Sequence, residues 1–125
     1  HKVVSLKLRQ FFYKKNYLWK NKDFTSPIAA YYGYIHPKFP NNWRDVGRVT
    51  DEYVGCHFSW CMNVDEMVHK LDTYSHPRYR FCSNKELLQN AIDNKIYPFD
   101  EGVDFDIEEL DKDSELIIKS IREEL

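Results

Sequence analysis

Hydrophobic and polar residues alternate at the start of the chain. Residues 3–13 (VVSLKLRQFFY) place valine and leucine between serine, lysine and arginine at every second position, and this period of two is typical of a half-buried strand. Two further β-like runs are residues 28–35 (IAAYYGYI) and residues 53–58. The second of these runs contains Gly55. The first half of the chain is therefore predicted to contain strands, separated by a Pro- and Asn-rich loop at residues 37–47.

The pattern changes to a helical period in the second half. Asn63, followed three residues later by Glu66, is a capping-box signal, and apolar residues then recur at three- and four-residue spacing. These features predict a helix over residues 64–74. The same signal beginning at Ser83 predicts a second helix over residues 84–95.

A third helix is predicted over residues 114–124, whereas the acidic, turn-rich residues 96–113 are expected to hold no long element. Strands early and helices late are the order expected of one α/β domain, or of part of one that begins partway through its sheet.

Composition narrows the class of protein. A length of 125 residues suits a single domain, and 8 Phe, 9 Tyr and 3 Trp supply enough apolar surface for a core, which excludes a disordered tail or linker. No apolar run reaches the length that spans a bilayer. Three cysteines cannot all pair within the chain, so a small disulfide-stapled secreted domain is disfavoured and a reducing compartment, or one bridge plus a free thiol, is expected.

The net charge of −2 conceals a gradient along the chain. Residues 1–50 carry ten basic and two acidic side chains, whereas residues 101–125 carry three and ten. A basic half attracts anions, which could be nucleotide phosphates, a nucleic acid or the acidic end of the same chain. Basic and aromatic residues interleave in residues 9–22, as in single-strand nucleic-acid binders, but we favour a strand whose aromatic side chains form core.

The densest group of candidate functional side chains is GCHFSWC at residues 55–61, between a predicted strand and a helix. Ligands of open α/β sheets bind beyond the carboxyl ends of strands, so His57 and Ser59 are candidates, with a hydrogen-bonded core histidine as the alternative for His57. Asp65 and Glu66, in the first turn of the helix, are either helix caps or a general base.

Two residues farther along have equally open interpretations. Lys70 is a phosphate contact if a phosphate lies close, and otherwise a solvated lysine. His76 belongs to the segment YSHPR, which stops the helix at its proline. The spacings of histidine and cysteine match no common structural zinc site.

GCHFSWC, followed by Asp65, Lys70 and the pair Ser75-His76, resembles the C-terminal half of glycosyltransferase family 17. This family comprises the β-1,4-mannosyl-glycoprotein β-1,4-N-acetylglucosaminyltransferases and their microbial and viral relatives. The resemblance covers residues 6–96 and extends upstream to the aromatic strand and to Arg44.

The resemblance implies an α/β, GT-A (Rossmann-like) fold and inverting transfer of N-acetylglucosamine or a related sugar from a UDP-sugar to a glycan acceptor, with Mn²⁺ or Mg²⁺. It implies Asp65, or else Glu66, as the base that deprotonates the acceptor hydroxyl, and His57 as a metal ligand or phosphate contact. The substrate-binding residues expected from it are Arg44, Ser59, Trp60, Lys70 and His76.

Two departures from the family pattern matter. Cys56 stands where the family has tryptophan, and the family's Asp-x-Asp metal motif at a strand end is missing, since the two such strings begin at Asp104 and Asp111 in the acidic end. We therefore expect an incomplete catalytic domain that turns over nothing alone.

The alternative is a non-catalytic carbohydrate- or nucleic-acid-binding module that uses the basic, aromatic N-terminal half. A microbial or viral parent implies the cytoplasm, which we prefer, and a membrane-anchored eukaryotic parent implies the Golgi lumen.

Overall fold

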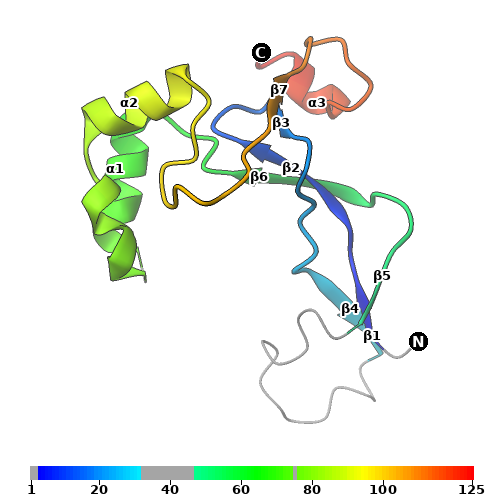
Figure 1. The fold of residues 1–125 in the computed structure, drawn as a ribbon. Coiled ribbons are helices and arrows are strands. Elements are labelled where there is room, and N and C mark those ends of the chain that lie inside the picture. The colour runs from blue at the N-terminus through cyan, green and yellow to red at the C-terminus, as the bar shows by residue number, and fades with distance from the viewer. Residues whose placement is uncertain (1–2, 32–46, 75) are drawn as a thin grey trace. The chain divides into compact units, whose positions relative to one another are not determined.

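The computed structural model describes residues 3–31, 47–74 and 76–125 (Figure 1). It is a mixed α/β structure with two small sheets and few helices. The chain divides into a first unit, His1–Gln10 with Lys22–His57, and a second unit, Phe11–Asn21 with Phe58–Leu125.

The first unit contains a three-stranded sheet of order β4-β1-β5. Strand β1 (Val3–Ser5) pairs antiparallel with β4 (Ile28–Ala30) and parallel with β5 (Arg48–Val49). Gly47 precedes β5 at a point of close approach, where a Cβ atom would lie 2.6 Å from the carbonyl oxygen of Val3. A side chain at this position would displace the β1 backbone, so the glycine is required by packing.

The other sheet has four strands in the order β6-β2-β3-β7. They are β2 (Leu8–Phe12), β3 (Tyr17–Trp19), β6 (Gly55–Ser59) and β7 (Ile107–Glu109). Strand β3 pairs antiparallel with both β2 and β7. The division between the units falls within β2 and within β6, so both strands contribute residues to each unit.

The strand predictions hold in part. The predicted run 3–13 is two strands, β1 and β2, and the run 28–35 is a strand only over Ile28–Ala30, with residues 32–35 outside the described residues. The run 53–58 corresponds to β6, and strands β3, β5 and β7 are additions that the alternation pattern did not predict. The GT-A architecture stays a prediction.

The predicted first helix is confirmed as α1 (Val64–Thr73). The Asn63 side-chain oxygen accepts from the Glu66 N–H at 2.9 Å, and a Glu66 carboxylate oxygen accepts from the Asn63 N–H at 3.0 Å. This reciprocal pair satisfies two backbone donors that a helix start leaves open. A 3₁₀ helix, η3 (Pro77–Cys82), follows α1.

The second helix is confirmed as α2 (Lys85–Asp93), which lies beside α1 (Figure 1). The expected cap at Ser83 is wrong. The Asn84 side-chain oxygen accepts from the Leu87 N–H, whereas the Ser83 hydroxyl donates to Asp72 at 2.6 Å. Both residue types are good caps, and the side chain of Ser83 is already engaged with α1.

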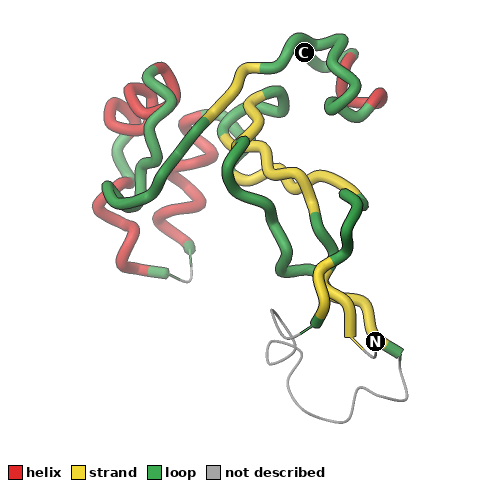
Figure 2. Tube along the Cα trace, turned by 45° about the vertical axis from the view of Figure 1, so that its right-hand side comes forward, coloured by secondary structure: helices red, strands yellow, loops and turns green. Residues whose placement is uncertain are grey.

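The predicted third helix is too long, because α3 comprises only Lys119–Arg122. The Ser114 hydroxyl oxygen accepts from the Leu116 N–H, and the Ser114 carbonyl accepts from the Arg122 guanidinium at 3.1 Å. Such local bonds compete with helical ones, so the segment before Ile118 turns instead. The connection from α2 to β7 contains no helix or strand (Figure 2). The prediction that residues 96–113 hold no long element is therefore confirmed, since β7 within them is only three residues long.

The core of the second unit is aromatic. Side chains of β2 and β3 pack with the inner faces of α1 and α2, and the exposed fractions of Phe12, Tyr13, Tyr17 and Trp19 are 2 to 6%. The prediction that the aromatic residues of the N-terminal stretch form core is therefore confirmed. None of the helices in the described ranges is long and apolar enough to cross a membrane.

Candidate ligand site at the end of α1

The candidate site begins at Trp60, the first residue after β6. Its backbone is left-handed, with φ 56°, and its side chain is 7% exposed. Tyr13, just after β2, is left-handed as well, and its N–H donates to the Ser59 carbonyl at 3.2 Å. Left-handed backbone at a bulky residue costs on the order of 1–3 kcal/mol and concentrates at functional sites. The packing around Trp60 therefore offsets a conformation that its local sequence disfavours.

Lys70 of α1 lies over the ring of Trp60. Its ammonium nitrogen is 4.1 Å from the Trp60 ring centroid and 5.7 Å from that of Tyr74. Burial lowers the pKa of Lys70 from its ordinary value. No carboxylate within the described ranges lies within salt-bridge distance of Lys70. The charge is held by aromatic faces, which leaves its hydrogen-bonding capacity for a ligand.

Further rings and a guanidinium continue from the end of α1 into η3. The ring centroid of His76 lies 4.9 Å from that of Tyr74 and 6.3 Å from that of Tyr79, and the Arg78 guanidinium carbon lies 4.7 Å from the Tyr79 centroid. His76 and Arg78 are exposed. We call this set the Trp60 cluster; its members are Trp60, Lys70, Tyr74, His76, Arg78 and Tyr79.

The chemistry of the Trp60 cluster suits a ligand with an anionic part and a flat or apolar part. Lys70 and Arg78 are cations, and an arginine fork matches phosphate oxygens in geometry. The half-buried rings of Tyr74 and Tyr79 present surface to which the apolar face of a sugar or a base can pack.

Three of the predicted substrate-binding residues, Trp60, Lys70 and His76, thus lie in one cluster. Ser59 precedes Trp60 and is half-buried, and its carbonyl oxygen accepts from the Tyr13 N–H and from the Cys61 thiol. Its substrate role stays a prediction. Arg44 lies outside the described residues.

The two predicted carboxylates lie at the other end of α1. Asp65 pairs with Lys85 of α2, with 2.5 Å between carboxylate oxygen and ammonium nitrogen, and its side chain is 75% exposed. Glu66 is engaged in the capping box. The general-base role of either residue stays a prediction.

The residues present were tested for a fit to Mn²⁺ or Mg²⁺. His57, in the first unit, stacks on Phe24 with ring centroids 3.8 Å apart and an interplanar angle of 8°. Within residues 3–31, 47–74 and 76–125, no three His, Cys, Asp or Glu side chains come together as a metal-binding group. The donor set of the described residues thus does not fit the ion.

The sequence pattern did not identify Tyr74, Arg78 and Tyr79 as site residues. The signal is present in the alternation of aromatic and basic residues in YSHPRYR, but from the sequence this segment is interpreted as a helix stop and, through the resemblance, only His76 is taken from it as a substrate-binding residue. Pro77 does end the α-helical course, and η3 then brings Tyr79 back toward His76.

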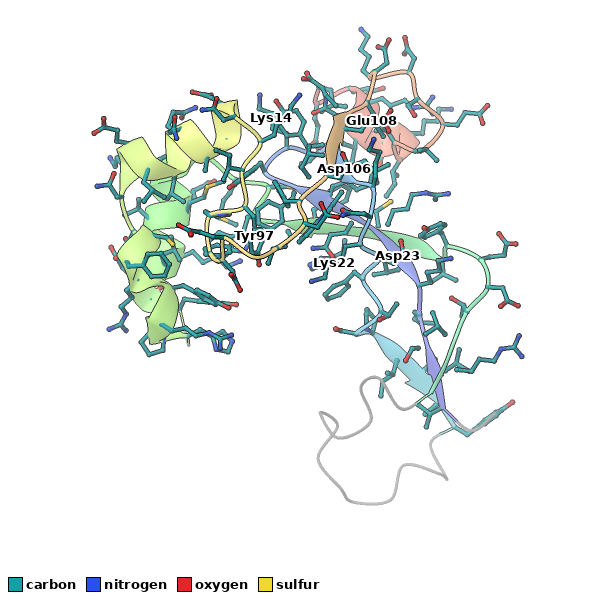
Figure 3. The ribbon with its side chains drawn as sticks, in the orientation of Figure 1. Lys14, Lys22, Asp23, Tyr97, Asp106 and Glu108 are labelled. Atoms are coloured by element: carbon teal, nitrogen blue, oxygen red, sulfur yellow. The ribbon has the colours of Figure 1, made fainter. Side chains whose placement is uncertain are left out.

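The basic residues of the β2–β3 hairpin face the acidic C-terminal segment. Lys15 pairs with Glu124, and Lys20 pairs at 3.5 Å with Asp106, which lies just before β7 (Figure 3). Lys95 pairs with Glu109 at 3.7 Å. Part of the positive charge of the basic half is thus neutralised inside the second unit by the acidic end of the same chain, which was one of the three alternatives that the sequence left open.

Comparisons with protein-family models, with curated proteins and with solved structures found no match to this chain.

Proposed function

We propose that this chain is the C-terminal, acceptor-side part of an inverting glycosyltransferase of GT-A type, similar to family 17. In this proposal the enzyme transfers N-acetylglucosamine or a related sugar from a UDP-sugar to a glycan. The observation that supports it is the Lys70 ammonium over the Trp60 ring, directly after the strand that carries the family-like motif. Tyr74 contacts both members of this pair, and the other members of the Trp60 cluster continue from Tyr74 through His76 to Tyr79 and Arg78.

The proposed role of the cations follows from the reaction. When the bond between the anomeric carbon and the UDP oxygen breaks, negative charge develops on the diphosphate, and preorganised cations stabilise it. Lys70 and Arg78 supply two positive charges, and Tyr74 with Tyr79 packs against the sugar or the uracil.

Asp65, which the resemblance implies as the base, is kept in this role although it lies at the opposite end of α1 from Lys70. It takes the proton of the acceptor hydroxyl while that oxygen attacks the anomeric carbon and UDP leaves. Asp65 must first separate from Lys85. Exposed ion pairs are worth about 0–1 kcal/mol, so breaking this pair costs little free energy.

A ligand titration followed by ¹⁵N NMR tests the proposal. We expect UDP-N-acetylglucosamine and UDP to shift the Trp60 indole and the amides near Lys70 and Tyr79, and free uridine to shift them less. Shifts confined to residues outside the Trp60 cluster, or none, contradict it. We expect no transfer by this chain alone.

The nucleic-acid alternative is tested in parallel. The aromatic side chains Phe12, Tyr13, Tyr17 and Trp19 of the basic stretch are buried, so bases cannot stack on them. Tyr31 and Tyr53 are exposed in the described N-terminal half, but the Tyr53 ring is already in contact with the Lys7 and Arg9 cations. We expect negligible binding of single-stranded oligonucleotides. Binding whose affinity falls with salt at a slope of several phosphates would favour that alternative instead.

A further inference from the structure

The second unit carries an apolar groove that shares no lining residue with the Trp60 cluster, although Phe99, which lines the groove, contacts the rings of Trp60 and Tyr79. It has a volume of about 550 Å³ and is formed by η3, α2 and residues 96–101. Three large apolar side chains at this groove are exposed to solvent: Phe81 at 66%, Ile96 at 50% and Leu87 at 40%. Apolar side chains that gather in this way typically mark an interaction site.

Hydrogen bonds hold the groove wall in place. The Tyr13 hydroxyl donates to the Ile96 carbonyl at 2.6 Å, and the Cys82 thiol donates to the Pro98 carbonyl at 2.9 Å. Tyr97, between these two anchors, lies on the connection from α2 to β7 (Figure 3). The groove therefore exists before any partner binds, which lowers the entropy cost of docking.

Carboxylates that form no salt bridge in the described part of the chain lie at the groove and beside it; two of them accept hydrogen bonds, Asp100 from the Gly102 N–H and Asp93 from the Gln89 side chain. Asp100 and Glu101 line it, and Glu86 and Asp93 line an adjoining hollow along α2 that shares Leu87 with it. None of these four carboxylates forms a salt bridge with another residue in the described part of the chain. The lysines at the two ends of α2 pair with other carboxylates. The rim therefore carries negative charge that a cationic partner would complement.

The groove also favours one shape of partner. Its lining residues come from helices and a loop and include no strand, so an extended peptide finds no sheet edge for backbone pairing. A helix that inserts apolar side chains needs no such edge. A second copy of this chain is a poor occupant, because the exposed positions of its α1 and α2 include Asp65, Asp72, Glu86 and Asp93.

We propose that this groove binds a basic amphipathic helix of a partner protein, whose aliphatic side chains pack against Phe81, Leu87 and Ile96 and whose lysines or arginines face the carboxylate rim. The proposal is independent of the glycosyltransferase function, since it uses none of the Trp60 cluster.

The test uses a synthetic helical peptide with leucines at positions i, i+3, i+4 and i+7 and lysines elsewhere. Its controls are the same peptide with glutamate for lysine and a scrambled peptide of equal composition. Calorimetry measures affinity and ¹⁵N NMR maps the contact. The full chain is expected to bind the lysine peptide at the groove and neither control.

Two pairs of variants assign the interaction. Phe81→Ala with Leu87→Ala removes exposed side chains and should weaken binding by about tenfold or more, as anchor residues typically do. Glu86→Gln with Glu101→Gln should weaken it by about threefold, because it removes two rim charges. The matched control, Glu108→Gln with Glu115→Gln, removes two exposed charges elsewhere and should leave affinity unchanged.

Several outcomes overturn the proposal. These are absence of binding, equal binding of the scrambled peptide, or equal loss in the control pair, which would indicate general charge attraction. Sedimentation that shows a dimer of the full chain, dissociated by the alanine pair, would assign the groove to a second copy instead. Circular dichroism melting of each variant separates lost binding from lost folding.

Discussion

The ammonium nitrogen of Lys70 lies 4.1 Å from the ring centroid of Trp60, so a cation of α1 lies over the residue that directly follows β6. Because aromatic faces rather than a carboxylate hold this charge, the site can accept an anion without first breaking an ion pair. Burial disfavours the charged form of Lys70 and so lowers its pKa.

The first prediction concerns the protonation of Lys70. Burial lowers its pKa below the ordinary 10.5, so the folded chain loses this proton at a lower pH than the unfolded chain. At pH values where Lys70 is charged in both the folded and the unfolded chain, its burial lowers the free energy of unfolding. This cost disappears as the pH rises through the lowered pKa toward 10.5, because the folded chain then loses the proton first. Stability from this residue therefore increases with pH in that window. Titration of the Lys70 Cε resonance by NMR should give a pKa below 10.5, and saturating UDP should raise it. A value at or above 10.5 without ligand contradicts the account.

The capping box at the start of α1 gives a second prediction. Asn63→Ala removes the acceptor for the Glu66 N–H and should lower the free energy of unfolding by about 1 kcal/mol. Glu66→Gln keeps an acceptor oxygen for the Asn63 N–H and should cost less, whereas Glu66→Ala should cost more than the glutamine variant. Urea unfolding followed by circular dichroism measures all three. Equal stability of the alanine and glutamine variants at Glu66 would show that its side chain is not a cap.

The end of α2 gives a third prediction, which concerns backbone strain at Lys95. The backbone of Lys95 is left-handed, with φ 52°. The Lys95 N–H donates to the Ile92 carbonyl and the Ile96 N–H donates to the Ala91 carbonyl, and these two hydrogen bonds form a Schellman motif. Glycine relieves the left-handed cost of about 1 kcal/mol. It loses an ion pair with Glu109 and a contact of the ammonium 5.3 Å from the Tyr17 ring centroid, and we expect these two contacts together to be worth less.

We therefore expect Lys95→Gly to raise the free energy of unfolding by about 0.5 kcal/mol. Lys95→Ala is the control, because it loses the same ion pair and keeps the strain, and it should be less stable than the glycine variant. Thermal melting of both variants decides. A glycine variant no more stable than the alanine variant argues against strain at this position.

A fourth prediction concerns thiol chemistry. Burial is the main cause that raises the pKa of Cys61 to about 12, against a smaller opposing effect of Lys15, and burial raises the pKa of Cys56 and Cys82 as well. Because the thiolate is the nucleophile, all three should react with Ellman's reagent at pH 8 at least about tenfold more slowly in the folded chain than in guanidinium chloride. The variants Cys56→Ser and Cys82→Ser isolate each contribution. Labelling of folded Cys61 as fast as in the denatured chain would contradict its burial.

The sequence predicted features that depend on near neighbours. The capping box of Asn63 and Glu66 spans three residues, so its signal is complete within the sequence window, and α1 follows it as expected. The choice between Ser83 and Asn84 as the second cap was decided by a contact of Ser83 with Asp72, eleven residues away. That contact has no local signature.

Features that depend on distant pairing were missed. Strand β7 forms because Ile107 lies opposite Trp19 in the sheet, a pairing that alternation within either short segment does not reveal. The candidate site shows the same limit. Lys70 was singled out from the sequence, but the position of Tyr79 beside His76 depends on the 3₁₀ turn that follows Pro77.

The most direct test of the proposed function is calorimetric titration of UDP into the wild-type chain and into Lys70→Met and Lys70→Arg. Methionine keeps the length and apolar contact of the lysine without its charge, and arginine keeps a charge over the Trp60 ring. The account predicts that the methionine variant binds UDP at least about tenfold more weakly than wild type while the arginine variant stays within about threefold, because a charge-assisted contact is lost only in the first. Equal affinity of the methionine variant and the wild-type chain for UDP would contradict it.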